Sequence, residues 1–225
     1  MLNSLSALHR TKITGNDGDI GHVSQALFDD QAWRLRFLVV RTSPWLLGRR
    51  VLVVPSMLIQ PITAGSMHLD LSRRVIRTGP TLHPLQEVTP QQTHAAMLHY
   101  EQVPSWPERA ALYSDIDLQG FSVGSGQDFL GAVHDIVFDD TDWTLRYFMV
   151  DTSAWWQGGH RVLIGVRWTD GIDAAAKVIR VGLTRAQIQG SPSFQDVGSI
   201  DRDYEARLHR SYAQAGYWER LQAQT

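Results

Sequence analysis

Ser122 lies at the centre of the sequence GFSVG, residues 120–124, which fits the G-x-S-x-G pattern of a hydrolase nucleophile. That nucleophile needs a strand before the serine and a helix after it, inside a parallel α/β sheet. Here a second Gly-Ser-Gly (residues 124–126) and then a strand-like sequence follow, and they carry neither the rest of a dinucleotide-binding fingerprint nor its helix. We therefore predict a turn between two strands, with no catalytic residue and no cofactor.

Two further groups of residues carry types that bind metals. Asp139, Asp140 and Asp142 form an acidic cluster, but a calcium loop of the EF-hand type has a glycine at its sixth position and a glutamate at its twelfth, and both are missing. His94 and His99 are five residues apart on an expected helix, so their side chains diverge. We predict a solvated turn for the aspartates and no metal site.

Composition excludes several classes of protein. The 225 residues include 43% hydrophobic and 20% charged residues, which predicts a folded core. The net charge of −2 gives no basic excess for nucleic acid, so no nucleic-acid partner is expected. With no cysteine, disulfides and thiolate metal sites are absent. The first ten residues do not fit a signal peptide, and no apolar run approaches the ~20 residues of a membrane span. A cytoplasmic location is the expectation.

The chain contains an internal repeat. Residues 21–45 align with residues 131–155 without a gap, and twelve of the 25 positions are identical. The shared residues include the FDD sequence, a tryptophan, Leu-Arg and Thr-Ser. Farther on, Val75-Ile76-Arg77 matches Val178-Ile179-Arg180, and Ala96-x-Leu98-His99 matches Ala206-x-Leu208-His209. A period of about 110 residues predicts two domains, 1–110 and 111–225.

Each repeat is expected to be mainly β. Short segments rich in aromatic and β-branched residues recur at about ten-residue spacing, which is typical of a small barrel or sandwich. The expected strands of the first repeat are 12–16, 20–28, 33–41, 49–55, 67–71 and 74–77; those of the second are 129–138, 144–151, 161–166 and 177–183. The loops DDQA and DDTD join two of them as hairpins, because Asp stabilises such turns.

A short helix is expected after each set of strands. Thr89, Pro90 and Gln92 form a capping box with a proline at the first helical position. In the second repeat Tyr204, Leu208 and Tyr212 are spaced four apart, so they share one helix face. We interpret that face as packed on the strands, with Gly216 as a helix stop.

This order of motifs resembles the PRC-barrel family. The resemblance rests on the G-x-V hairpin, the FDD turn, W-x-L-R-[FY]-x-x-V, T-S-x-W and a glycine-bearing loop before R-V-L, over residues 10–80 and 118–190. The family includes the cytoplasmic domain of the photosynthetic reaction-centre H subunit and the C-terminal domain of the ribosome maturation factor RimM. The resemblance implies a mainly β fold with short helices, built of two tandem small PRC-like β-barrels, each followed by a helix. It implies an adaptor or assembly module and no enzyme.

The loops that follow the shared Thr-Ser are the candidate partner-binding sites. Each places large apolar residues beside glycine and one or two cations, and such side chains either fold back over the strands or meet a partner. Tryptophan and arginine are frequent anchors of protein interfaces. The candidate residues are Trp45, Leu46, Leu47, Arg49, Trp155, Trp156, His160 and Arg161.

Three functions compete on this basis. The first is a non-catalytic adaptor that binds a protein partner through these loops, or self-associates through a pseudo-two-fold pairing of its repeats. The second is a peripheral membrane protein related to the reaction-centre H subunit, with Trp45, Leu46 and Leu47 dipping into the membrane surface next to Arg49 and Arg50. The third is a small-ligand or metal-binding enzyme, although we predict no small-molecule substrate.

Overall fold

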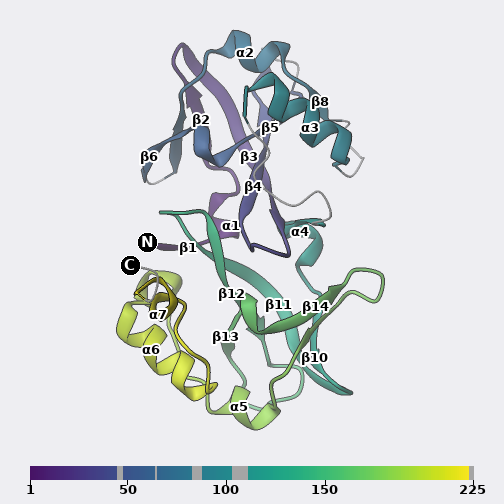
Figure 1. Ribbon diagram of the computed structural model, residues 1–225, viewed down its shortest axis with the longest axis vertical. Helices are drawn as coiled ribbons and strands as arrows, with labels where there is room; N and C mark the ends of the chain where they lie inside the picture. The colour runs from purple at the N-terminus through teal and green to yellow at the C-terminus, as the bar shows by residue number, and fades with distance from the viewer. Residues whose placement is uncertain (45–47, 64, 83–87, 103–110, 223–225) are drawn as a thin grey trace. The chain divides into compact units, whose positions relative to one another are not determined.

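The computed structural model of the protein describes residues 1–225 except 45–47, 64, 83–87, 103–110 and 223–225. These residues form two compact units, and neither is one continuous stretch of chain (Figure 1). The N-terminal unit comprises Leu5–Ile116 and Asp142–Thr144; the C-terminal unit comprises Met1–Ser4, Asp117–Thr141 and Leu145–Thr225. The fold is mainly β with short helices, as predicted. None of the helices in the described part of the chain is long and apolar enough to cross a membrane.

The N-terminal unit is built on a sheet with the strand order β6-β7-β2-β3-β4-β5-β8, and β9 pairs with β3 off this path. The strands are β2 Lys12–Gly15, β3 Gly18–Asp29, β4 Leu35–Thr42, β5 Arg50–Val53, β6 Leu58–Thr63, β7 Ser66–Leu69, β8 Thr81–Leu82 and β9 Leu112–Ser114. Strands predicted around residues 12–16, 20–28, 33–41, 49–55 and 67–71 are confirmed. A closed barrel stays a prediction.

The C-terminal unit repeats this arrangement with the order β13-β12-β11-β10-β15-β14, and β1 pairs with β11 off the path. Its strands are β1 Leu2–Ser4, β10 Ser122–Ser125, β11 Asp128–Asp139, β12 Thr144–Asp151, β13 Arg161–Gly165, β14 Thr169–Asp173 and β15 Val178–Val181. The four strands predicted for this repeat are confirmed, and β10 and β14 are additions that the sequence pattern did not predict. In the N-terminal unit the hairpins β2–β3 and β6–β7 are joined by a parallel pairing of β2 with β7. In the C-terminal unit β10–β11 and β14–β15 are joined in the same way, by β10 with β15.

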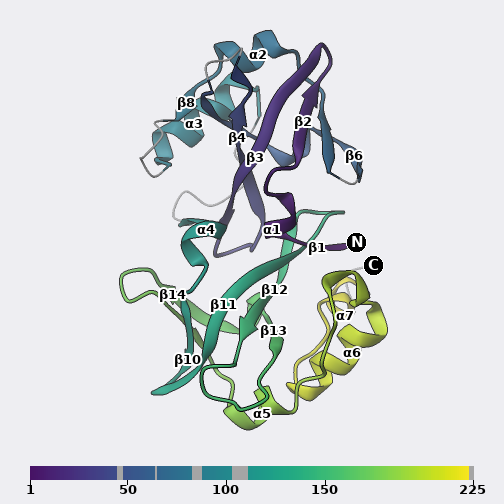
Figure 2. The ribbon, with the colours of Figure 1, turned by 180° about the vertical axis from the view of Figure 1, so that it is seen from behind.

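Each sheet takes one short strand from the other repeat (Figure 2). β1, which opens the first repeat, pairs with β11 of the second, and β9, which opens the second repeat, pairs with β3 of the first. The registers agree: Leu2 lies opposite Asp139, and Leu112 lies opposite Asp29. Both pairs are therefore related by the 110-residue repeat period, and the exchange is reciprocal. The sequence analysis predicted neither strand.

A glycine shared by the repeats lets the long strands bend closely over their neighbours. A Cβ at Gly21 would lie 2.1 Å from the Arg41 carbonyl oxygen, and a Cβ at Gly131 would lie 2.4 Å from that of Asp151. Gly131 also has a φ of 143°, which L-residues rarely adopt. Because β3 and β11 bend here, one half of each strand pairs with β2 or β10 and the other half with the exchanged strand.

The predicted FDD hairpins are present in both units, and an ion pair supports each one. In the N-terminal unit Arg36 Nε donates to Asp29 Oδ2 at 2.7 Å, while Asp29 Oδ1 accepts from the backbone of the turn. In the C-terminal unit Arg146 Nη2 donates to Asp139 Oδ2 at 3.1 Å. The Asp of the repeated FDD sequence and the Arg of the repeated Leu-Arg, seven positions later in the chain, thus form an ion pair in both units.

The helices are α1 Leu5–Leu8, α2 Arg73–Thr78, α3 Pro90–His99, α4 Asp115–Leu118, α5 Arg185–Gln189, α6 Arg202–Ser211 and α7 Tyr217–Gln222, with short 3-10 turns at Pro55–Met57, Val166–Trp168 and Val197–Ser199. The Thr89–Gln92 capping box of α3 is confirmed. The predicted face of α6 is buried at Tyr204, Leu208 and Tyr212, and Figures 1 and 2 show α6 beside β13. α6 ends at Ser211, five residues before the expected stop.

The prediction of a strand at 74–77 is wrong, because this segment lies in α2. Ser72 precedes the helix and Ile76 is its buried residue; Thr184 and Ile188 hold the same places at α5. The two helices share the pattern L-[ST]-R-x-x-I with an offset of 112 residues. The alignment of Val75-Ile76-Arg77 with Val178-Ile179-Arg180 was therefore wrong. The counterpart of β15 is β7 at Ser66–Leu69, because each pairs in parallel with the equivalent strand, β10 or β2.

Candidate partner-binding site

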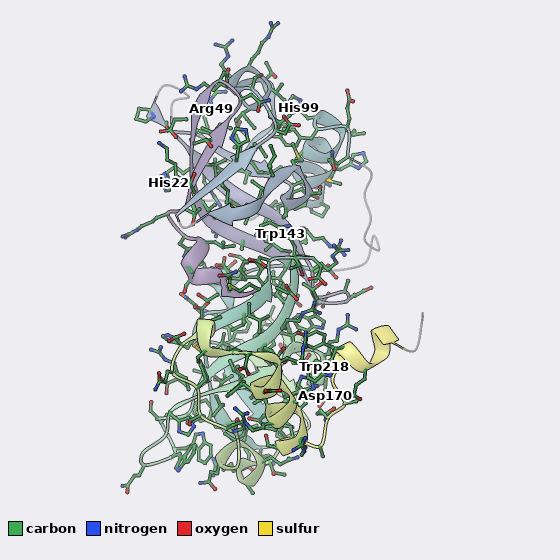
Figure 3. The ribbon with its side chains drawn as sticks, turned by 90° about the vertical axis from the view of Figure 1, so that its left-hand side faces the viewer. His22, Arg49, His99, Trp143, Asp170 and Trp218 are labelled. Atoms are coloured by element: carbon green, nitrogen blue, oxygen red, sulfur yellow. The ribbon has the colours of Figure 1, made fainter. Side chains whose placement is uncertain are left out.

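The two predicted Trp loops differ in what the structure describes. Trp45, Leu46 and Leu47 lie outside the described residues. Arg49 is exposed (Figure 3). Arg50 donates through Nη2 to the side chain of Gln25, so its charge is held at the sheet. Of the residues in the proposed membrane anchor of the first repeat, Arg49 is thus the exposed cation that the structure describes. The corresponding loop of the second repeat is described in full.

Thr152 organises the loop of the C-terminal unit, which we define as residues 152–161 and call the Trp loop. Its carbonyl oxygen accepts from the backbone N–H groups of Trp155 and Trp156 at 3.3 and 3.2 Å. Its hydroxyl donates to the carbonyl oxygen of His160 at 2.7 Å, which ties the two ends of the loop together. The buried threonine is shared with the first repeat as Thr42, so the base of the loop is fixed by the repeated sequence.

Two indole rings stack in the Trp loop, and the ring of His160 packs against them at an angle. The centroids of Trp155 and Trp156 are 6.1 Å apart with nearly parallel planes, and those of Trp156 and His160 are 4.9 Å apart. The guanidinium of Arg185, on α5, lies 5.0 Å from the Trp155 ring, within cation–π range. All three rings are partly buried. These contacts join the three rings and Arg185 into one cluster.

Two ring nitrogens in the Trp loop lack hydrogen bonds. Trp155 Nε1 and His160 Nε2 are shielded from solvent, and neither has a partner among the described residues. An indole N–H can only donate. A buried polar group without a partner costs about 1–3 kcal/mol, so these two nitrogens lower the stability of the loop.

The rim of the Trp loop carries charges of both signs. Arg161 is exposed, and Arg185 lies 3.9 Å from Asp128. Hydrogen bonds from Ser153 lower the pKa of Asp151, and the nearby side chains of His134 and Arg161 add to this effect. Asp151 is thus held ionised next to the loop. A polar rim around apolar rings is the usual anatomy of a protein interface.

A second cluster of titratable groups fixes α6 to the C-terminal sheet. Tyr147 Oη donates to Glu205 Oε1 at 2.7 Å and lies 3.0 Å from His209 Nε2. His209 Nδ1 lies 2.9 Å from the carbonyl oxygen of Ala215, which can only accept, so Nδ1 carries a hydrogen. Tyr217 also donates to Glu205 Oε1, at 2.9 Å. We call Tyr147, Glu205, His209 and Tyr217 the helix latch.

The histidine and both tyrosines of the helix latch are uncharged at neutral pH. Burial lowers the pKa of His209, so its ring is neutral. Burial also raises the pKa of Tyr147, and it raises that of Tyr217 to about 12. Trp168 and Trp218 pack edge-on against His209, with ring centroids 5.0 and 4.9 Å away, and shield it. The arrangement links α6 and α7 to the C-terminal sheet.

The helix latch belongs to the second repeat alone. The C-terminal caps of α3 and α6 are Tyr100 and Tyr212, so the helices are equivalent with an offset of 112. Met97 then stands where His209 does, and Thr93 stands where Glu205 does; both are buried. The match of His99 to His209 was displaced by two residues. His99 Nε2 instead lies 2.9 Å from the carbonyl oxygen of Val75.

The other candidates from the sequence are also placed. Asp139 and Asp140 both receive the N-terminal ammonium of Met1, while Asp142 belongs to the other unit. In the described part of the chain no group of three or more His, Asp or Glu side chains is arranged to hold a metal. The prediction of a turn at Ser122 is wrong, because Ser122 begins the strand β10, which pairs with β11 and with β15; the turn follows this strand, at residues 126–127.

The sequence was also compared with known proteins. No model of a known protein family matches it, and no curated protein matches it.

Proposed function

We propose that the protein is a non-catalytic adaptor of the PRC-barrel kind, which binds a protein partner through the Trp loop of its C-terminal unit. The observation that carries this proposal is the cluster of Trp155, Trp156 and His160, in which the two indole rings stack and His160 packs against Trp156 at an angle. The three side chains are partly exposed. A partner that covers the cluster buries apolar ring surface, which favours binding.

The composition of the loop supports a protein as the partner. Trp and Arg dominate the energetic hot spots of protein interfaces, where one side chain often contributes about 2 kcal/mol or more. Arg161 and Arg185 flank the rings, and Asp128 and Asp151 balance their charge, so the surface has no excess of one sign. A strongly basic surface would have favoured an anionic membrane instead.

A photocrosslinking residue at Gln157 tests the proposal. Gln157 is exposed in the Trp loop, and Ala175 is an exposed control in the turn between β14 and β15. In cells, we expect a defined protein adduct from position 157 and none from position 175. Trp156→Ala should lower the adduct yield by roughly tenfold or more, since about 1.4 kcal/mol corresponds to a factor of ten. Gln157→Ala serves as the matched variant in binding assays and should leave affinity nearly unchanged.

Two results would overturn this function. Equal adduct yields from positions 157 and 175 would mean that the Trp loop is not the docking surface. Flotation with vesicles of anionic phospholipid, lost on Trp156→Ala in the absence of any protein adduct, would replace the protein partner by a membrane surface. The thermal midpoint of Trp156→Ala, measured alongside, shows whether the variant is folded.

A further inference from the structure

The exchanged strands occupy equivalent edges but are held by different residues. β9 continues into Asp115, whereas the equivalent residue after β1 is Leu5. Asp115 Oδ1 accepts from the backbone N–H of Ala26 at 2.9 Å, and Asp115 Oδ2 lies 2.6 Å from His9 Nε2. The Asp115 side chain is 5% exposed. A buried carboxyl group with two partners at the end of a three-residue strand provides most of the polar specificity of this junction.

Ser114 and Tyr113 add to the fit of β9. Gln25 Nε2 donates to Ser114 Oγ at 3.2 Å, and the ring of Tyr113 packs 6.2 Å from that of Phe28. The edge of β3 therefore offers a defined set of groups to an incoming strand: the N–H of Ala26, the amide of Gln25 and the ring nitrogen of His9.

The equivalent edge of the second repeat offers a different set. Asp135 stands in the place of Gln25, and Ile136 stands in the place of Ala26. The N–H of Ile136 is already occupied, because it donates to Asp135 Oδ1 at 2.7 Å. Asp135 is itself buried. If β9 paired with its own repeat, Asp115 would meet a second buried carboxyl group and compete with it for one N–H. Two carboxylates that share a site repel each other.

We propose that Asp115 determines which strand β9 pairs with and directs it to the edge of β3. This edge is a docking site specific for the segment Leu112–Asp115 of the other repeat. The segment is supplied by the second repeat of the same chain. Asp135 closes the second repeat's own edge to the same segment. The edge of β11 takes Leu2–Ser4 instead, because Leu5 brings no carboxyl group to it.

Engineered disulfides distinguish the two pairings, since the chain has no cysteine of its own. Ser114 lies opposite Leu27 in the exchanged arrangement, and by the repeat it would lie opposite Val137 if β9 paired with its own repeat. Opposite residues of an antiparallel pair have Cα atoms about 4.5–5.5 Å apart, within the range of a disulfide. In the otherwise native full-length chain we expect S114C/L27C to oxidise in high yield and S114C/V137C to oxidise at least tenfold less.

Asp115 and Asp135 are then substituted in the background of each cysteine pair. Asp115→Leu with Asp135→Gln gives the second repeat the residues of the first, and it should raise the yield of S114C/V137C and lower that of S114C/L27C. Asp117→Leu removes a neighbouring exposed carboxyl group of α4 as the matched control, and it should change neither yield. Asp115→Asn keeps the shape of the side chain and should give a smaller change in the same direction.

The outcomes decide the proposal even where a variant folds poorly. Equal oxidation of the two pairs with Asp115 and Asp135 in place would overturn it. So would unchanged yields in both Asp115→Asn and the double variant.

Discussion

Asp29→Ala should lower the free energy of unfolding of the N-terminal unit by about 3–5 kcal/mol, the usual loss when one member of a buried ion pair is removed. Asp29 is fully buried, and Arg36 is 7% exposed at its side chain. The substitution removes the carboxylate that lies 2.7 Å from Arg36 Nε. It also removes Asp29 Oδ1, which accepts hydrogen bonds from the N–H groups of Gln31 and Ala32 in the hairpin turn.

Urea denaturation followed by tryptophan fluorescence measures this loss, and the repeat supplies the matched control. Asp139 is the equivalent residue, but its side chain is 16% exposed and its Arg146 partner is 11% exposed. Water replaces part of what Asp139→Ala removes, so we expect a loss of only about 1–2 kcal/mol. Equal losses for the two variants, or a loss below about 1 kcal/mol for Asp29→Ala, would show that burial of the hairpin ion pair does not matter.

Tyr147→Phe should destabilise the C-terminal unit by about 2–3 kcal/mol, although the first repeat has a phenylalanine, Phe37, at this position. The hydroxyl of Tyr147 donates to Glu205 and contacts His209. Both partners are buried, and without the hydroxyl they keep their desolvation cost. Thermal unfolding followed by circular dichroism measures the change. Tyr217→Phe removes one hydrogen bond to Glu205 from a less buried ring and should cost about 1 kcal/mol. A neutral Tyr147→Phe would contradict the helix latch.

The helix latch also predicts a pH dependence. Burial lowers the pKa of His209 below its ordinary value of 6.5 in the folded protein. As the pH falls through 6.5, the unfolded chain therefore takes up a proton that the folded protein does not, and the free energy of unfolding decreases. His209→Met, which copies Met97 of the first repeat, should flatten this decrease between pH 7 and pH 5. Equal slopes for the two proteins would exclude His209 as the cause.

The sequence predicted the strands and hairpins well, because burial on both sides of β4 and β12 requires continuous apolar runs that are visible in any single copy. The FDD turn and the Thr-Ser loop base were visible for the same reason: each is stabilised by local hydrogen bonds, such as those of Asp29 and Thr152. The capping box of α3 is equally local. Interactions within about ten residues are therefore the ones that the sequence pattern revealed.

Longer-range features were missed for physical reasons. A short strand such as Leu112–Ser114 looks the same whichever edge it joins, since both repeats offer the same register. The signal was the shared L-x-S at positions 2–4 and 112–114, followed by Leu5 in one copy and Asp115 in the other. Similarly, the exchange of Phe37 for Tyr147 is conservative in sequence, yet the added hydroxyl finds Glu205 and His209 about sixty positions away.

Cleavage of the chain between the repeats tests whether each repeat is completed by a strand from the other. A protease site inserted among residues 103–110, which lie outside the described residues, allows the folded full-length protein to be cut once. Because Leu2–Ser4 and Leu112–Ser114 then belong to different fragments from their partner strands, we expect the fragments to stay together. Native size-exclusion with mass measurement should show one species with about the 25.4 kDa mass of the chain. Two separate species, each folded and with the mass of one fragment, would show that the exchanged strands do not hold the repeats together.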